Sequence, residues 1–125
     1  YLTSEHFFQS QKFIGTQYED MIRKIVRPGE VASFGRNRSL PLRKDWESVK
    51  DNIMRKAVMA KFTQHKGIQE KLLATGDAKL VEDSPIDFYW GVGNDGSGKN
   101  MLGIILMEVR SSIRINDYSY KIGKC

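Results

Sequence analysis

The feature that most constrains the fold is a short stretch near the C-terminal end, residues 101–109, in which seven of the nine positions are apolar. A helix with so small a polar face has to be enclosed on most sides by other parts of the chain. Asn100 precedes the stretch and can cap the start of such a helix. A chain of 125 residues can build one core around it, but not two catalytic domains.

Helical patterns also dominate the rest of the sequence. Thr16 and Glu19 have the spacing of a capping box, which predicts a helix that ends before Pro28. Asp45 can cap a long helix whose apolar positions recur at helical spacing from Trp46 onward. Further helices are expected at residues 4–14, 31–34 and 68–76.

Two segments are expected to form strands instead. Residues 80–82 predict a brief strand, and the apolar residues of 113–122 alternate across Asn116 and Asp117 in the manner of a hairpin. Residues 35–44 carry four basic side chains and predict a basic loop. The fold class expected from these elements is α+β: a compact, helix-rich single domain with a small β-sheet.

Charge and cysteine content limit the partners of the chain. Lys and Arg together number 20 against 15 Asp and Glu, and the net charge of +5 favours anionic partners such as phosphates without demanding nucleic acid. Cys125 is the only cysteine, and His6 and His65 are isolated, so neither an internal disulfide nor a metal site is expected. The longest apolar runs, such as Ile104–Met107, are four residues long and too short to cross a membrane. We expect a soluble, cytoplasmic protein with no cofactor and no membrane partner.

The first candidate site is the glycine-rich loop of residues 91–99. It partly fits two nucleotide-binding patterns, but Asn100 stands where a phosphate-binding loop needs Ser or Thr, and too few residues follow for a parallel sheet. The narrower expectation is that Gly91 lets the backbone approach a ligand and that the helix start at Asn100 binds an anion. A tight turn without a ligand is the alternative.

The second candidate is a polar stripe on the first helix. Glu5, Gln9 and Lys12 are spaced i, i+4, i+7, so they project from one side of a helix. The carboxylate can activate water or stabilise a developing cation, whereas the lysine can neutralise a phosphate or act as a nucleophile once burial lowers its pKa. The alternative is a solvated surface, although the phenylalanines of the same helix favour a cavity.

The third candidate is Asp87, which is followed by three aromatic residues that end at Trp90. Trp90 or the distant Trp46 can hold a flat heterocycle by stacking, while an enclosed Asp87 can stabilise positive charge on a sugar carbon. The alternative is that the rings belong to the core and that Asp87 caps a turn.

Taken together, these segments resemble the YbiA-like NADAR family, from Tyr1 to about Ile113. The matching strings follow the order of the family: T-S-E-H-F-F-Q at 3–9 with Q-K-F at 11–13, W-x-x-x-K at 46–50 followed by Met54, K-F at 61–62, L-L-x-T-G at 72–76, L-x-E at 80–82, D-x-x-W-G at 87–91, N-x-L-G at 100–103 and L-M-x-V-R at 106–110. The resemblance implies a YbiA-like α+β domain over residues 1–113, which lacks the family's usual N-terminal segment. Residues 114–125 are then a tail or hairpin of unknown role.

The resemblance also implies an N-glycosidase that hydrolyses the base-to-ribose bond of phosphorylated early riboflavin-pathway intermediates. The alternatives are removal of ADP-ribose from ADP-ribosylated guanine, a non-catalytic nucleotide-binding module, or a structural interaction protein. Nucleic acid is expected only as a modified substrate. The implied catalytic residues are Glu5, Asp87 and Lys12, and the expected substrate-binding residues are Trp46, Trp90, Gln9, Gly91 and Asn100. We expect Glu5, Lys12, Asp87 and Trp90 to line one cavity.

Overall fold

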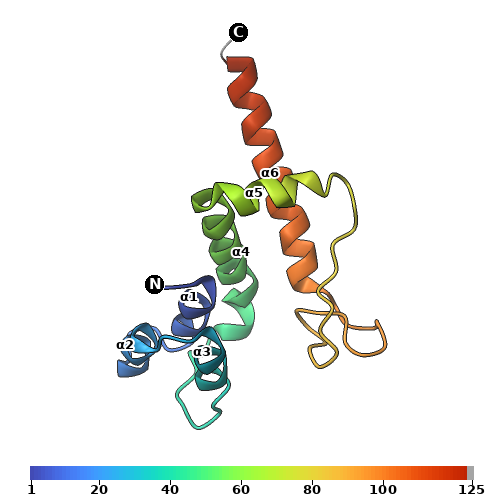
Figure 1. Cartoon of the computed structure of the whole chain (residues 1–125). Coiled ribbons are helices and arrows are strands. Elements are labelled where there is room, and N and C mark those ends of the chain that lie inside the picture. The colour runs from blue at the N-terminus through green and yellow to red at the C-terminus, as the bar shows by residue number, and fades with distance from the viewer. Residues whose placement is uncertain (124–125) are drawn as a thin grey trace. The chain divides into compact units, whose positions relative to one another are not determined.

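The computed structural model describes residues 1–123, and its regular structure there consists of six α-helices (Figure 1). Lys124 and Cys125, the end of the predicted tail, lie outside the described residues. The chain divides into two compact units, Tyr1–Ala57 and Val58–Cys125. Helix α4, Trp46–Gln64, begins in the first unit and continues into the second.

Three short helices precede α4 in the first unit: α1 (Ser4–Gln11), α2 (Gln17–Lys24) and α3 (Pro28–Gly35). The hydroxyl of Thr3 caps α1 by accepting the N–H of His6 at 3.1 Å. Thr16 caps α2 by accepting the N–H of Tyr18 at 3.2 Å, one position earlier than the capping box predicts. Hydroxyl caps therefore begin two of these helices, and Pro28 begins the third.

The core of the first unit forms where α1 packs against α2 and α3. Phe13, Ile22 and Val31 are almost completely buried. The rings of Phe13 and Phe34 meet edge to face, with centroids 6.3 Å apart and an interplanar angle of 89°. Burial of each large apolar side chain stabilises a fold by about 1.5–3 kcal/mol, so this small cluster fixes the three helices against one another.

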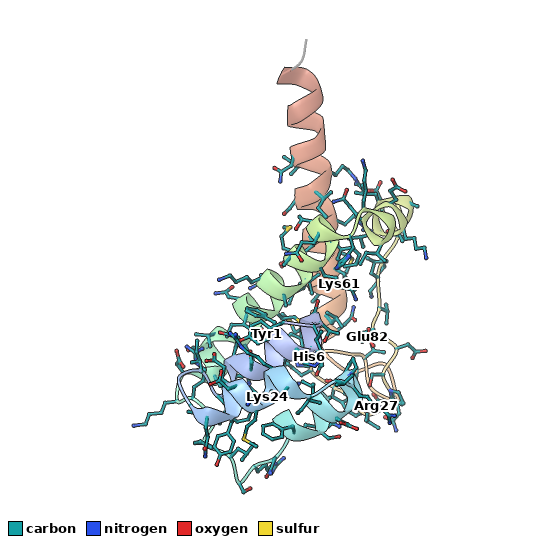
Figure 2. All side chains as sticks on the ribbon, turned by 60° about the vertical axis from the view of Figure 1, so that its left-hand side comes forward. Tyr1, His6, Lys24, Arg27, Lys61 and Glu82 are labelled. Carbon is teal, nitrogen blue, oxygen red and sulfur yellow. The ribbon has the colours of Figure 1, made fainter. Side chains whose placement is uncertain are left out.

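His6 links α1 to the segment between α2 and α3, near the labelled Lys24 and Arg27 (Figure 2). Its side chain is fully buried, and Nε2 lies 2.6 Å from the carbonyl oxygen of Ile25. A carbonyl only accepts, so Nε2 carries the proton, and Nδ1 accepts from the hydroxyl of Thr3 at 2.6 Å. His6 is therefore a packing residue of the first unit.

In the second unit, α5 (Lys66–Ala74) contacts α6 (Met101–Gly123). Ile105 and Val109 are buried, and among residues 101–109 only Ile104 and Glu108 are exposed, so this stretch of α6 is enclosed on most sides, as expected. Arg110 is also buried, and its guanidinium donates to the hydroxyl of Thr75 and to the carbonyl of Ala78. These bonds hold the segment after α5 on α6.

The predicted β-sheet is wrong, because residues 1–123 contain no strand. Residues 80–82 form no strand: the Asn100 amide donates to the carbonyl of Leu80 at 2.9 Å and accepts the N–H of Glu82 at 2.8 Å, and the carbonyl of Glu82 accepts the N–H of Val92 at 3.1 Å. The predicted hairpin is also absent, since α6 continues to Gly123. Asn116-Asp117 supplies no glycine for a tight hairpin turn, and each residue added to an existing helix gains a backbone hydrogen bond.

The boundary predicted at residue 113 falls inside α6, which passes through it without interruption. Within residues 1–123, no helix combines the length and the apolar character that a membrane span requires.

Candidate active site

The first unit contains a cavity of about 580 Å³ that places two of the predicted site residues, Lys12 and Trp46, in one lining. The lining comes from the end of α1, the start of α4 and the loop that joins α3 to α4. From this loop come Arg36 and Arg38, and α4 adds Glu47. The cavity therefore combines an aromatic wall with a basic rim.

The aromatic wall of the cavity includes Trp46, in the first turn of α4, and Phe8 of α1 packs edge to face against this ring. Their ring centroids are 5.2 Å apart at 62°, and both side chains are buried. The ammonium of Lys12 lies 5.7 Å from the Trp46 centroid and 5.9 Å from the Phe8 centroid. A cation at this distance from ring faces is attracted by their π-electrons, which fixes Lys12 beside the wall.

Lys12 is held at the C-terminal end of α3, where Nζ donates to the carbonyl of Gly35 at 3.1 Å. A positive charge is favourable there, because helix carbonyls lack internal partners. Burial lowers the pKa of the Lys12 ammonium below its usual value, attraction to Glu5 raises it in part, and repulsion from Arg36 lowers it further. The environment therefore suits both a fixed cation and an amine nucleophile.

Glu5 and Gln9 form the other part of the α1 stripe, since Gln9 Nε2 donates to Glu5 Oε1 at 2.8 Å. An ionised carboxylate only accepts, so this contact fixes the orientation of the amide. Gln9 Oε1 is buried beside the α-carbon of Gly35 and has no hydrogen-bond partner among the residues that the structure describes. A Cβ at residue 35 would overlap the Gln9 amide. Gly35 therefore leaves room for the Gln9 side chain that holds Glu5, and a larger residue would displace its amide.

In the second unit, Asp87 forms the turn cap that was the alternative to a catalytic role. Its Oδ1 accepts the backbone N–H groups of Tyr89 at 3.0 Å and Trp90 at 2.8 Å. The rings of Tyr89 and Trp90 meet at 4.8 Å, and both are half-buried, whereas Phe88 is 46% exposed. The turn thus orients Asp87 and Trp90 together.

The glycine-rich loop closes on itself at the start of α6. The N–H groups of Asn100, Met101 and Leu102 donate to the carbonyls of Gly91, Tyr89 and Trp90 at 2.9–3.0 Å. These donors are therefore not available to the anion expected at this helix start. A Cβ at Gly91 would lie 2.9 Å from the carbonyl oxygen of Glu82, so this glycine serves the approach of backbone to backbone.

Asn100 differs from the predicted helix cap. Its backbone adopts a positive φ of 54°, and its buried amide holds the 80–82 segment. Its side chain therefore has a structural task in this unit.

The predicted site residues fall into two groups, one in each unit. The first unit contains Glu5, Gln9, Lys12 and Trp46, and the second contains Asp87, Trp90, Gly91 and Asn100. That Glu5, Lys12, Asp87 and Trp90 line one cavity stays a prediction, because it joins residues of both units.

Arg36 and Arg38 are cavity residues that sequence reasoning placed in a basic loop without a role. The signal was a cluster of basic residues directly after a glycine, in a chain with a surplus of positive charge. Only the fold distinguishes them from Arg43, which pairs with Asp45 at 2.6 Å and donates to the carbonyl of Gln11. Among the described residues, no cluster of His, Cys, Asp or Glu is arranged to hold a metal ion.

Sequence and structure comparisons agree on the family. The NADAR domain family matches residues 1–114. The N-glycosidase YbiA of Shigella boydii is 55% identical over 113 residues, which are 90% of this chain and 71% of that protein. The riboflavin biosynthesis protein PYRR of maize chloroplasts is 40% identical over 121 residues, with 89% of this chain and 19% of that protein covered.

The NMR structure of the Escherichia coli protein YbiA superposes with a TM-score of 0.86 at 52% identity, over 92% of this chain and 68% of that chain. The YbiA-like part of the fold prediction is thus confirmed, although its β-sheet is not found in residues 1–123. The resemblance expected from the ordered motifs is confirmed as well: this chain belongs to the NADAR domain family.

Proposed function

We propose that this protein is an N-glycosidase that hydrolyses the base-to-ribose bond of phosphorylated ribosylaminopyrimidines, the early intermediates of riboflavin synthesis. The observation that carries the proposal is Lys12, partly desolvated against the ring of Trp46 in a cavity that Arg36 and Arg38 make basic. The aromatic wall suits a flat base, the polar stripe of α1 suits a ribose, and the basic rim suits a phosphate. The names of the Shigella and maize relatives support the reaction and the pathway.

Glu5 is the proposed acid–base residue of the reaction. When the bond between the sugar carbon and the base nitrogen breaks, its electron pair leaves with the base and positive charge develops on the sugar. The carboxylate of Glu5, oriented by Gln9, stabilises that charge, accepts a proton from the attacking water and passes this proton to the departing base. Asp87 is the second proposed carboxylate, and its turn presents it next to Trp90.

Lys12 acts in this proposal as a fixed positive charge, not as a nucleophile. Direct attack by water needs no covalent step, and the ammonium is held by the Gly35 carbonyl and by two ring faces. The second candidate function is removal of ADP-ribose from a modified guanine, which the same three features also fit.

One experiment separates these functions. The purified protein is incubated with a ribosylaminopyrimidine phosphate and, separately, with ADP-ribosylated guanine, and mass spectrometry follows the release of ribose phosphate or ADP-ribose. We expect release from the pyrimidine. Release from guanine alone would favour the second function, and release from neither would favour a nucleotide-binding module.

A further inference from the structure

We propose that Arg36 and Arg38 form a phosphate-recognition site at the rim of the cavity and select phosphorylated over unphosphorylated ribosides. The inference rests on the proposed function and adds to it the residues that determine specificity. It also makes the loop between α3 and α4, which sequence reasoning left without a role, part of the substrate site.

The first observation is that, within residues 1–123, no acidic side chain forms an ion pair with either arginine. Both side chains are exposed and both line the cavity. Within residues 1–123, the only partner of the Arg36 guanidinium is the hydroxyl of Ser33 at 3.5 Å, and Arg38 makes no ion pair or hydrogen bond through its side chain. Arg43 of the same loop, by contrast, is neutralised by Asp45. Two guanidinium groups are thus left to bind an anion from outside the chain.

The second observation is the charge balance of the cavity. Lys12, Arg36 and Arg38 face it, whereas its only acidic lining residue, Glu47, is paired with Lys50 at 2.5 Å. Arg36 is close enough to Lys12 to disfavour the ammonium by repulsion, so the cations act on a shared volume. A phosphate dianion in that volume relieves the repulsion and interacts with each of them.

The third observation is that Lys12 and the two arginines occupy different parts of the cavity lining. Lys12 is tethered to the Gly35 carbonyl and the ring of Trp46, which keeps it at the aromatic wall. The arginines come from the loop that starts where α3 ends. Guanidinium groups bind phosphate through two parallel N–H donors, whereas an ammonium acts as a point charge. The rim therefore suits the phosphate, and the wall suits the base.

The test compares one riboside with and without its 5′-phosphate in wild type, Arg36→Gln, Arg38→Gln and the double variant. We expect the double variant to lose about 10-fold to 100-fold in kcat/KM for the phosphorylated substrate and less than about 2-fold for the other. The control matched to each single variant is Lys44→Gln, which removes one positive charge from the same loop but does not line the cavity, and it should change kcat/KM less than about 2-fold.

Equal losses for both substrates, no loss at all, or an equal loss in Lys44→Gln would overturn the inference. Binding of ribose 5-phosphate and of ribose, measured by calorimetry, gives a readout that does not need turnover. If wild type hydrolyses neither riboside but binds ribose 5-phosphate through the two arginines, the proposed function fails and the phosphate site stands. If wild type is active and the variants do not discriminate, the phosphate site fails alone.

Discussion

Lys12 shows how one side chain gains its properties from neighbours that are distant in sequence. The Gly35 carbonyl, the Trp46 ring and the charge of Arg36 all come from residues at least 23 positions away. Sequence spacing predicted correctly that Lys12 shares a helix side with Glu5 and Gln9, which the Gln9–Glu5 hydrogen bond and the attraction of Lys12 to Glu5 support. It could not supply the partners that lower its pKa, because they depend on how α3 and α4 pack.

The role of Lys12 can be tested by Lys12→Arg together with borohydride. A fixed positive charge survives in the arginine variant, so we expect measurable activity, reduced because guanidinium is broader than ammonium. Borohydride added to wild type during turnover should leave no sugar adduct. An inactive arginine variant, together with a borohydride-dependent mass increase on the Lys12 peptide, would show that the amine attacks the sugar.

Glu5→Gln tests whether the negative charge of this carboxylate is needed for the reaction. The amide keeps the shape and a contact with Gln9 but removes the charge that the cationic transition state needs. We expect kcat to fall by about 10²-fold to 10⁴-fold with KM changed little, measured as release of the free base. Ser4→Ala is a control on the same helix, with no change expected in kcat. An increase in KM at constant kcat would instead assign Glu5 to binding.

At the level of elements, Gly35 of α3 leaves room for the Gln9 side chain of α1. Gly35→Ala would improve the helix propensity of α3 by about 1 kcal/mol, but the new methyl group would displace the buried Gln9 amide. We therefore expect a lower thermal midpoint and a lower kcat, because Glu5 loses the donor that orients it. Gly29→Ala, in the same helix and facing open space, gains helix propensity without the overlap, so its thermal midpoint should not fall and its kcat should stay almost unchanged. A Gly35 variant with wild-type kcat would show that Gln9 does not position Glu5.

Local signals predicted the helices well, but they wrongly predicted strands at residues 80–82 and 113–122. Thr3 and Thr16 cap helices in the structure because a hydroxyl needs only the N–H groups two or three residues ahead. The 80–82 segment, in contrast, is held by the side chain of Asn100, about 20 residues away. The apolar residues of 113–122 alternate in a way that fits a hairpin but also fits a continuation of the preceding helix. Local sequence rules do not choose between the two, and the structure shows the helix.

At the scale of the whole molecule, the candidate chemistry is distributed over two units. The first unit has a cavity with a carboxylate, a lysine and an aromatic wall nearby, and the second unit has a turn that orients Asp87 and Trp90. The ordered motifs of the family run through both units, since the family match spans residues 1–114. That Glu5 of the first unit and Asp87 of the second act at one site stays a prediction.

A double-mutant cycle with Glu5→Gln and Asp87→Asn tests that joint site. Groups that act on one transition state are strongly non-additive, because removal of the first already abolishes most of what the second supports. We expect the double variant to lose little more kcat than Glu5→Gln alone. Asp87→Asn keeps one acceptor oxygen for the N–H groups of Tyr89 and Trp90, so the turn should persist, and an unchanged thermal midpoint checks this. Fully additive losses would mean that the two carboxylates work independently, and wild-type activity in Asp87→Asn would limit the chemistry to the first unit.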